Sequence, residues 1–178
     1  MSRLRAHRAT TCVLFVSLIL LLPFRAWAQE QEQPSLLKDT VKRVVIDPTT
    51  YLPAIIAYDA TYRDWRTSQP FFEHGFNEHN PHFTASGLPN DAPISYSAGN
   101  RRIATDALIT LGTSAMTNVT GNIIERVLAE RYPEHRKLWR ALGWAGRISF
   151  ASYMSYRLSI GHYRQAQSNE QLARQQGW

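Results

Sequence analysis

The chain has 178 residues, 44% of them hydrophobic, with a formal net charge of +6 and a single cysteine. Four of its 20 basic residues but none of its 14 acidic residues precede residue 29, so the rest carries 16 basic and 14 acidic residues and a net charge of +2. This near balance argues against the concentrated basic face of a nucleic-acid-binding protein. Because the only cysteine is Cys12, disulfides and thiolate chemistry are excluded from residue 29 onward.

The first 28 residues have the three parts of a cleavable secretory signal peptide. Arg3, Arg5 and Arg8 form a basic start, an uncharged apolar run extends from Val13 to Phe24, and Ala26-Trp27-Ala28 is a typical cleavage site. The run is shorter than the roughly 20 residues that a membrane-spanning helix needs, although an uncleaved anchor is the alternative. We therefore expect an exported protein that begins at residue 29 and is periplasmic or associated with the cell envelope.

Residues 29–47 are predicted to form a polar linker followed by a short helix. The segment 29–34 is rich in glutamine and glutamate and has nothing to bury. Leu37, Val41 and Val44 then recur at helical spacing, and Pro48 forces the preceding residue out of the helical region. Residues 48–178 are expected to form a single helical domain.

A second helix is predicted to begin after Thr49 or Thr50. Its side chains at alternating four- and three-residue steps form an aromatic stripe. A stripe of this kind is typical of a helix that packs on its neighbours, and a ligand platform is the less common alternative. We therefore expect the stripe to belong to the core: Tyr51, Ile55, Tyr58, Tyr62 and Trp65.

The helical periodicity disappears between Pro70 and about Ala98. Four prolines, with several glycines and asparagines, exclude regular structure from this segment. Loops of this length in small domains are usually functional or disordered. The density of phenylalanines, which would form an unusual apolar patch if exposed, predicts an ordered loop that packs on the helices after it.

Two long helices are expected to follow the loop and to form a hairpin around Pro133. The first should begin at Ser97 or Asn100 and end near Glu130, and the second should continue toward Ala173, with a bend near Gly143 or an end near Gly161. The fold class is therefore all-α, a small helical bundle with a long helical hairpin and one long ordered loop. The predicted apolar stripe of the first long helix is Ala104, Leu108, Leu111, Ala115, Val119, Ile123 and Val127.

The loop also contains the main cluster of titratable side chains. His74, Glu78, His79 and His82 are candidate ligands for zinc or a related ion, although their spacing matches no known zinc motif. The alternative is architectural: Glu78, Asn80 and Pro81 would hold the turn, with Glu78 bound by an arginine of the hairpin. The arginines considered for this role are Arg101, Arg102, Arg147 and Arg157.

Four charged residues interrupt the helical stripes. Asp59, Asp106, Arg147 and Arg157 either face water, which is the commoner arrangement, or pair internally. If they pair, they mark a buried polar seam between the helices.

The segment from Asp59 to the end resembles a loose group of small bacterial helical membrane proteins of unknown function. The matching residues are Asp59, the Glu-x-Asn-Pro turn of Glu78, Asn80 and Pro81, the Gly87-x-Pro89 loop, and Gly161. The resemblance implies a helical bundle in a membrane. This chain departs from it, because its longest uncharged run, Ala107 to Ile124, contains seven threonine, serine and asparagine residues.

No catalytic motif is present: the chain lacks a Gly-x-Ser-x-Gly nucleophile elbow and a Gly-rich phosphate loop. We therefore expect no catalytic residues and no cofactor, apart from the metal ion considered above. The leading hypothesis is a non-enzymatic binding or envelope-associated module that contacts a partner or a membrane surface through its aromatic loop. The alternatives are an integral membrane hairpin of residues 107–124 and 141–163, and a metal-dependent enzyme that uses residues 73–82.

Overall fold

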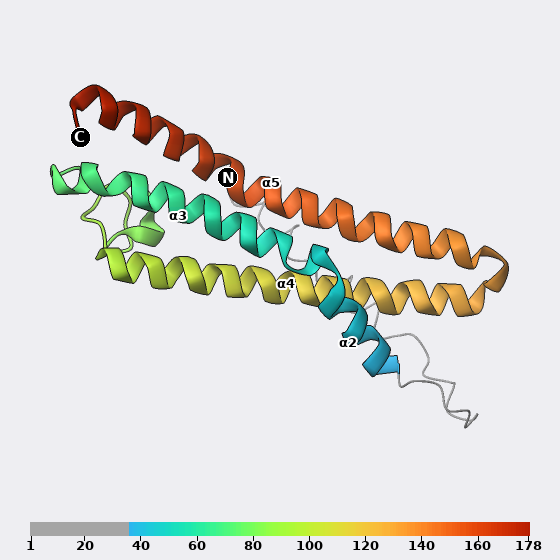
Figure 1. The fold of residues 1–178 in the computed structure, drawn as a ribbon. Coiled ribbons are helices and arrows are strands. Elements are labelled where there is room, and N and C mark those ends of the chain that lie inside the picture. Colours follow the sequence, from blue (N-terminus) through green and yellow to red (C-terminus); the bar gives the residue numbers. More distant parts are fainter. Residues whose placement is uncertain (1–35) are drawn as a thin grey trace, which may run out of the picture. The chain divides into compact units, whose positions relative to one another are not determined.

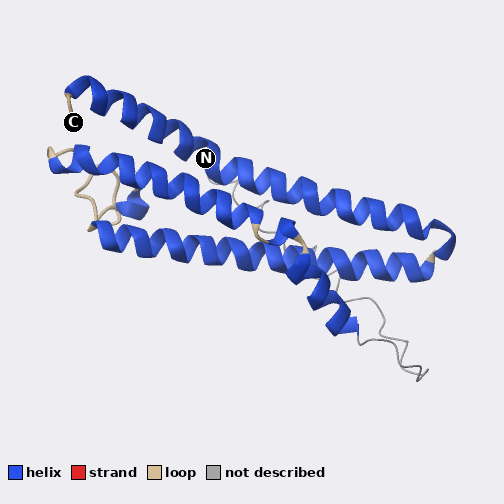
Figure 2. Ribbon diagram, in the orientation of Figure 1, coloured by secondary structure: helices blue, strands red, loops and turns tan. Residues whose placement is uncertain are grey.

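The structure, a computed structural model, describes residues 36–178. The predicted signal peptide, 1–28, and the polar residues 29–35 lie outside the described part. The described chain is all-α and contains four α-helices joined by short 3-10 turns and one long loop (Figures 1 and 2). The expected fold class is therefore confirmed. Helix α2 spans Leu36–Ile46, α3 spans Leu52–Glu73, α4 spans Tyr96–Arg131 and α5 spans Arg136–Gln176.

Helices α4 and α5 form the expected hairpin, and α3 lies between them in the half away from the hairpin turn (Figure 1). Helix α2 contacts α4 near its middle. The turn is the 3-10 helix Pro133–His135, which begins with a proline at a position where no backbone donor is lost. Helix α5 continues through Gly161 as a single helix of 41 residues.

Short polar motifs fix the ends of the elements. Asp47 caps the 3-10 turn Pro48–Thr50 by accepting a hydrogen bond from the backbone N–H of Thr49. Ser95 caps α4 in the same way, one residue or more before the expected start. These side chains satisfy backbone donors that the first helical turn leaves free.

Helix α3 ends one turn later than the sequence predicts, because it includes Pro70. A proline inside a helix removes one backbone hydrogen bond and costs about 3 kcal/mol. Here the last turn gains the packing of Phe72 on Trp65, with ring centroids 5.6 Å apart, and a hydrogen bond from the His74 N–H to the Pro70 carbonyl. The long loop therefore begins at residue 74 rather than at Pro70.

The apolar core is small and lies where the loop meets α3 and α4. Trp65, Phe83 and Ile103 are its buried members. The Trp65 ring lies flat on α4 at Gly99, where an added Cβ atom would fall 2.3 Å from the indole. The loop contributes Phe83, so its expected packing on the helices is confirmed for α4.

The buried faces of the long helices differ from those predicted. On α4 the buried side chains beyond Ile103 are polar, whereas Leu108 of the predicted apolar stripe is 68% exposed. On α3, Trp65 is buried as expected, but Ile55 is 61% exposed, and Tyr51 and Tyr58 are exposed as well. Of the predicted α4 stripe, Ala104, Leu108 and Val127 are exposed, and Leu111, Ala115, Val119 and Ile123 are half-buried. The buried polar side chains of α4 are Ser114, Asn118, Asn122 and Glu125.

Candidate functional site

A polar seam connects α2, the Pro48–Thr50 turn, α4 and α5. Arg147 of α5 donates to Asp47 and to Glu125 of α4, each over 3.0 Å. Arg43 of α2 lies 3.6 Å from the other oxygen of Glu125. Because Arg147 and Glu125 are both largely buried, their charges need each other. Arg147 therefore pairs internally, as one of the two readings of the sequence allowed.

Asparagines extend this seam along α4. The Asn118 side chain donates to the hydroxyl groups of Thr49 and Thr50, over 2.9 and 2.7 Å, and Asn122 donates to the carbonyl of Asn118. Every one of these side chains is buried. Such amide and hydroxyl pairs replace apolar contacts at the centre of the helical bundle, and each is satisfied by another residue of the chain.

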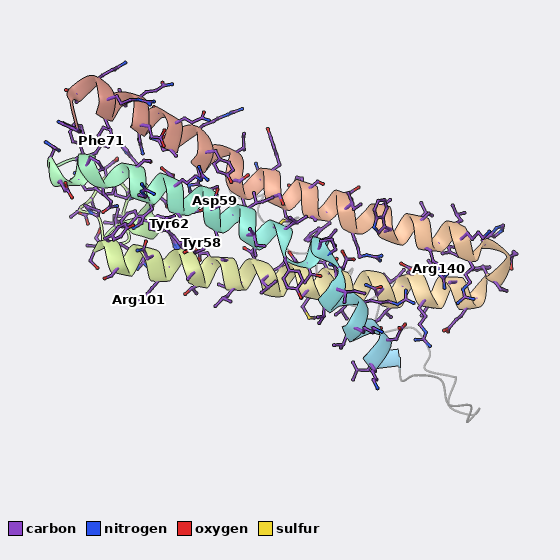
Figure 3. All side chains as sticks on the ribbon, in the orientation of Figure 1. Tyr58, Asp59, Tyr62, Phe71, Arg101 and Arg140 are labelled. Atoms are coloured by element: carbon purple, nitrogen blue, oxygen red, sulfur yellow. The ribbon has the colours of Figure 1, made fainter. Side chains whose placement is uncertain are left out.

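A second set of polar contacts joins α3 to α5. Asp59 accepts a hydrogen bond from the Tyr163 hydroxyl at 2.8 Å, and Asp64 lies 2.7 Å from Nδ1 of His162. Figure 3 shows Asp59 on the side of α3 toward α5, with Tyr58 and Tyr62 on the side toward α4. Burial, and then the hydrogen bond to Asp59, raise the pKa of Tyr163 above its ordinary value.

These contacts border a groove between α3, the loop and the C-terminal half of α5. The groove has a volume of about 500 Å³, within the range of small-molecule sites. A smaller hollow of about 290 Å³ lies toward α4, and the two hollows share Thr61, Asn80, Phe83 and His162.

The loop residues singled out as metal ligands lie at different places. His74 hydrogen-bonds the Pro70 carbonyl and stacks on Trp178, with ring centroids 3.8 Å apart. His82 binds Asp106 of α4 at 2.8 Å, and His79 lines the groove. Within residues 36–178 no three histidine, cysteine or carboxylate side chains gather as metal ligands would.

The turn itself is held by local hydrogen bonds. Asn80 accepts from the His82 N–H and caps the 3-10 helix Pro81–Phe83, while Glu78 accepts from the Asn80 N–H at 2.7 Å. The expected bond between Glu78 and an arginine is wrong. Arg102 donates instead to the His82 carbonyl, and Arg147 donates to Asp47 in the polar seam. A hydrogen bond from Ser86 lowers the pKa of Asp91, which pairs with Glu78 through backbone hydrogen bonds across the loop.

Large apolar side chains lie on the outside of the α4–α5 hairpin. They occupy the uncharged stretch of α4, 107–124, and the facing stretch of α5, 141–156. The single charged residue of the α5 stretch is Arg147, which is paired with Glu125. We call this surface the outer hairpin face. Its members are 44–68% exposed: Leu108, Ile109, Met116 and Ile124 of α4, and Leu142, Tyr153 and Tyr156 of α5.

The threonines beside these side chains do not break the apolar character of the face. Thr113 and Thr117 donate their hydroxyl groups to backbone carbonyls four residues earlier, over 2.9 Å, and Thr120 does so over 3.0 Å. Because each of these hydroxyl groups is bonded to a carbonyl of its own helix, the threonine side chain presents mainly its methyl group to the surroundings.

The sequence reasoning did not single out Asp64, His162 or Glu125. Asp64 and His162 are 98 positions apart, and no spacing rule connects them. The buried polar stripe of α4 did leave a signal, because Asn118, Asn122 and Glu125 recur at helical spacing.

Comparison with known proteins adds no relative. No protein-family model, no curated protein and no solved structure matches the chain. No helix between residues 36 and 178 combines the length and the apolar character that a membrane crossing requires.

Proposed function

We propose that this chain is a non-enzymatic, envelope-associated helical module that rests on a membrane surface through the outer hairpin face. The observation that carries the proposal is the inverted distribution of side chains along α4. Ser114, Asn118 and Asn122 are buried, while Leu108 and Met116 are 68% and 67% exposed. In water an amphipathic helix turns its apolar stripe to the core, and large exposed apolar surfaces mark contacts with a membrane or a partner.

The charges at the two ends of the face favour a membrane over a protein partner. Ala107 to Ile124 is an uncharged stretch of 18 residues, roughly 27 Å of helix. Exposed basic residues lie beyond both ends of this stretch, at the start of α4 and at the hairpin turn, where they outnumber the exposed Glu130 and Glu134 and suit anionic lipid head groups. Figure 3 labels one residue of each group, Arg140 and Arg101.

Aromatic side chains on α5 fit the same orientation. Tyr153 and Tyr156 are 59% and 60% exposed, and tyrosine favours the boundary between water and lipid. Arg157 follows Tyr156 and is exposed, and its long side chain can carry the charge to the head groups.

The proposal includes export through the signal peptide of residues 1–28. The basic start, apolar run and Ala-x-Ala site of residues 1–28 would carry the module out of the cytoplasm. Mass spectrometry of the exported protein should give a chain that begins at Gln29. An intact Met1 in that sample would contradict cleavage.

Vesicle flotation tests the membrane contact. The purified protein should float with vesicles of phosphatidylethanolamine and phosphatidylglycerol. The double variant Leu108→Gln/Leu142→Gln should lose at least about tenfold in affinity, because each leucine gives up burial in lipid. The matched control is Leu37→Gln/Leu88→Gln, which changes two equally exposed leucines outside the face.

Two results would overturn the proposal. The first is equal binding of the two double variants, since the outer hairpin face would then not be the contact. The second is a protein that ignores vesicles and forms a dimer that Leu108→Gln/Leu142→Gln disrupts, since the face would then be covered by a second copy of the chain.

A further inference from the structure

The groove between α3, the loop and α5 has aromatic walls. Trp65 and Phe83 lie at its base, with ring centroids 5.1 Å apart, and Phe71, Phe72 and Phe76 line its sides. Phe71 and Phe76 are in edge-to-face contact at 5.9 Å. Trp65 and Phe83 are 3% and 4% exposed and give the groove an apolar base, whereas the less buried rings of Phe71, Phe72 and Phe76 carry on their faces the negative charge of the aromatic quadrupole.

The formal charges of the groove are all negative. Asp64 and Glu78 line it, and its lining includes no lysine or arginine. The adjoining hollow adds a third carboxylate, Asp106, and again no lysine or arginine. The histidines near these carboxylates, His162 and His82, bind them through one ring nitrogen each.

Each carboxylate of the groove has an oxygen available to a ligand. Oδ2 of Asp64 binds His162 and Oε1 of Glu78 binds the Asn80 N–H. Within the described chain the second oxygen of each carboxylate has no side-chain partner. Asp64 is 18% exposed, so a charge placed next to it would be partly shielded from water.

From this combination we propose that the groove binds a small organic cation, an ammonium group attached to an apolar body. The carboxylates and ring faces would hold the ammonium, and Phe71, Phe72 and Leu172 would cover the apolar part. An anion of the same shape would meet two carboxylates and no basic side chain other than histidine. The proposal stands apart from the membrane contact, which uses none of the residues that line the groove.

Calorimetric titration of the purified protein with three ligands that share one chain tests the inference. The probes are octyltrimethylammonium, octyl sulfate and octyl glucoside, all below their micelle concentrations. We expect the ammonium to bind at least about tenfold more tightly than the other two. Binding of all three with equal affinity would overturn the proposal, because only the apolar chain would then be recognised.

Two neutral substitutions locate the cation. Asp64→Asn and Glu78→Gln should each weaken octyltrimethylammonium binding by about five- to tenfold. Glu134→Gln removes the same charge at the exposed hairpin turn and should leave affinity within about twofold. If Asp64→Asn unfolds the protein, Glu78→Gln decides the question, since Glu78 makes only a local backbone bond. Unchanged affinity in Glu78→Gln and Asp64→Asn would overturn the proposal.

The same titration separates the groove from the outer hairpin face. Leu108→Gln/Leu142→Gln should bind octyltrimethylammonium as the unmodified protein does, even where it no longer binds vesicles. Loss of ammonium binding in this variant would assign the cation to the membrane-facing surface and overturn the groove assignment.

Discussion

Arg147 holds three segments of the chain together, because its guanidinium group binds Asp47 before α3 and Glu125 of α4. Replacing it with methionine would leave two carboxylates in a largely buried place without their main partner. Removing one member of a buried pair costs about 3–5 kcal/mol, so we expect Arg147→Met to lower the free energy of unfolding by that amount. Denaturant titration measures the change.

Arg140→Met provides the control for this loss. Arg140 lies on the same helix two turns earlier and is exposed near the hairpin turn (Figure 3). Exposed substitutions of this kind usually change stability by less than about 0.5 kcal/mol. Equal effects of Arg147→Met and Arg140→Met would mean that the seam contributes little and that the charges are better solvated than the structure indicates.

Two glycines of α5 should respond in opposite ways to alanine. At Gly143 an added Cβ atom would lie 2.6 Å from Oε2 and 3.2 Å from Cβ of Glu125, so Gly143→Ala should push the helices apart and destabilise the protein. At Gly146 nothing lies within 4 Å. Gly146→Ala should therefore stabilise α5 by about 0.5–1 kcal/mol. Thermal unfolding of the two variants, which differ only in position, checks the sign of each effect.

At the scale of the elements, the contact between α3 and α5 should give way in alkali. The pKa of Tyr163 is raised in the folded chain by burial and by its hydrogen bond to Asp59. A raised pKa adds stability that is complete below the tyrosine pKa of the unfolded chain, about 10, and that is lost as the pH rises through the folded pKa. We expect stability to fall above about pH 10, and Tyr163→Phe to reduce this fall.

Absorbance at the wavelength of tyrosinate, followed in both proteins, identifies the group that ionises. Tyr62 complicates the titration, because its hydrogen bond to Tyr96 also raises its pKa. Tyr62→Phe is therefore the companion variant. An alkaline transition that persists unchanged in Tyr163→Phe would show that this contact does not hold α5 on α3.

The positions of the elements could be predicted from the sequence, but the direction of their faces could not. Periodicity and capping residues depend on neighbours a few positions away, so α2, α3, α4 and α5 were all expected within a few residues of where they lie. A stripe, however, shows only that side chains share a face. Leu108 was predicted to be buried because it is apolar, yet it is 68% exposed, whereas Asn118, which was assigned to no face, is 1% exposed.

The groove was largely beyond sequence reasoning for a different reason. Its loop wall was noticed, because Glu78, His79 and Asn80 cluster in the chain. Its other wall comes from α5, whose His162 carries no local motif and meets Asp64 only when the hairpin closes over α3. Two residues so far apart in the sequence meet only through helix packing, and helix packing cannot be derived from the composition and local spacing of one sequence.

At the scale of the whole molecule, the polar interior should be visible in the heat capacity of unfolding. Exposing apolar surface raises this heat capacity and exposing polar surface lowers it, for a usual net value of about 12–15 cal/mol/K per residue. In residues 36–178 the largest fully buried side chains include Asn118, Thr84 and Ser114 beside Ile103, and many leucines and aromatics are exposed already in the folded state.

We therefore expect a heat capacity change clearly below the usual range, under about 10 cal/mol/K per residue, for the protein as a lipid-free monomer. Scanning calorimetry at several pH values gives it as the slope of unfolding enthalpy against melting temperature. The measurement should be repeated over a range of protein concentrations, because a second copy that covers the outer hairpin face would bury those side chains and raise the value. A value in the usual range at the lowest concentration would contradict the inverted arrangement, since the exposed apolar side chains would then be buried within one chain.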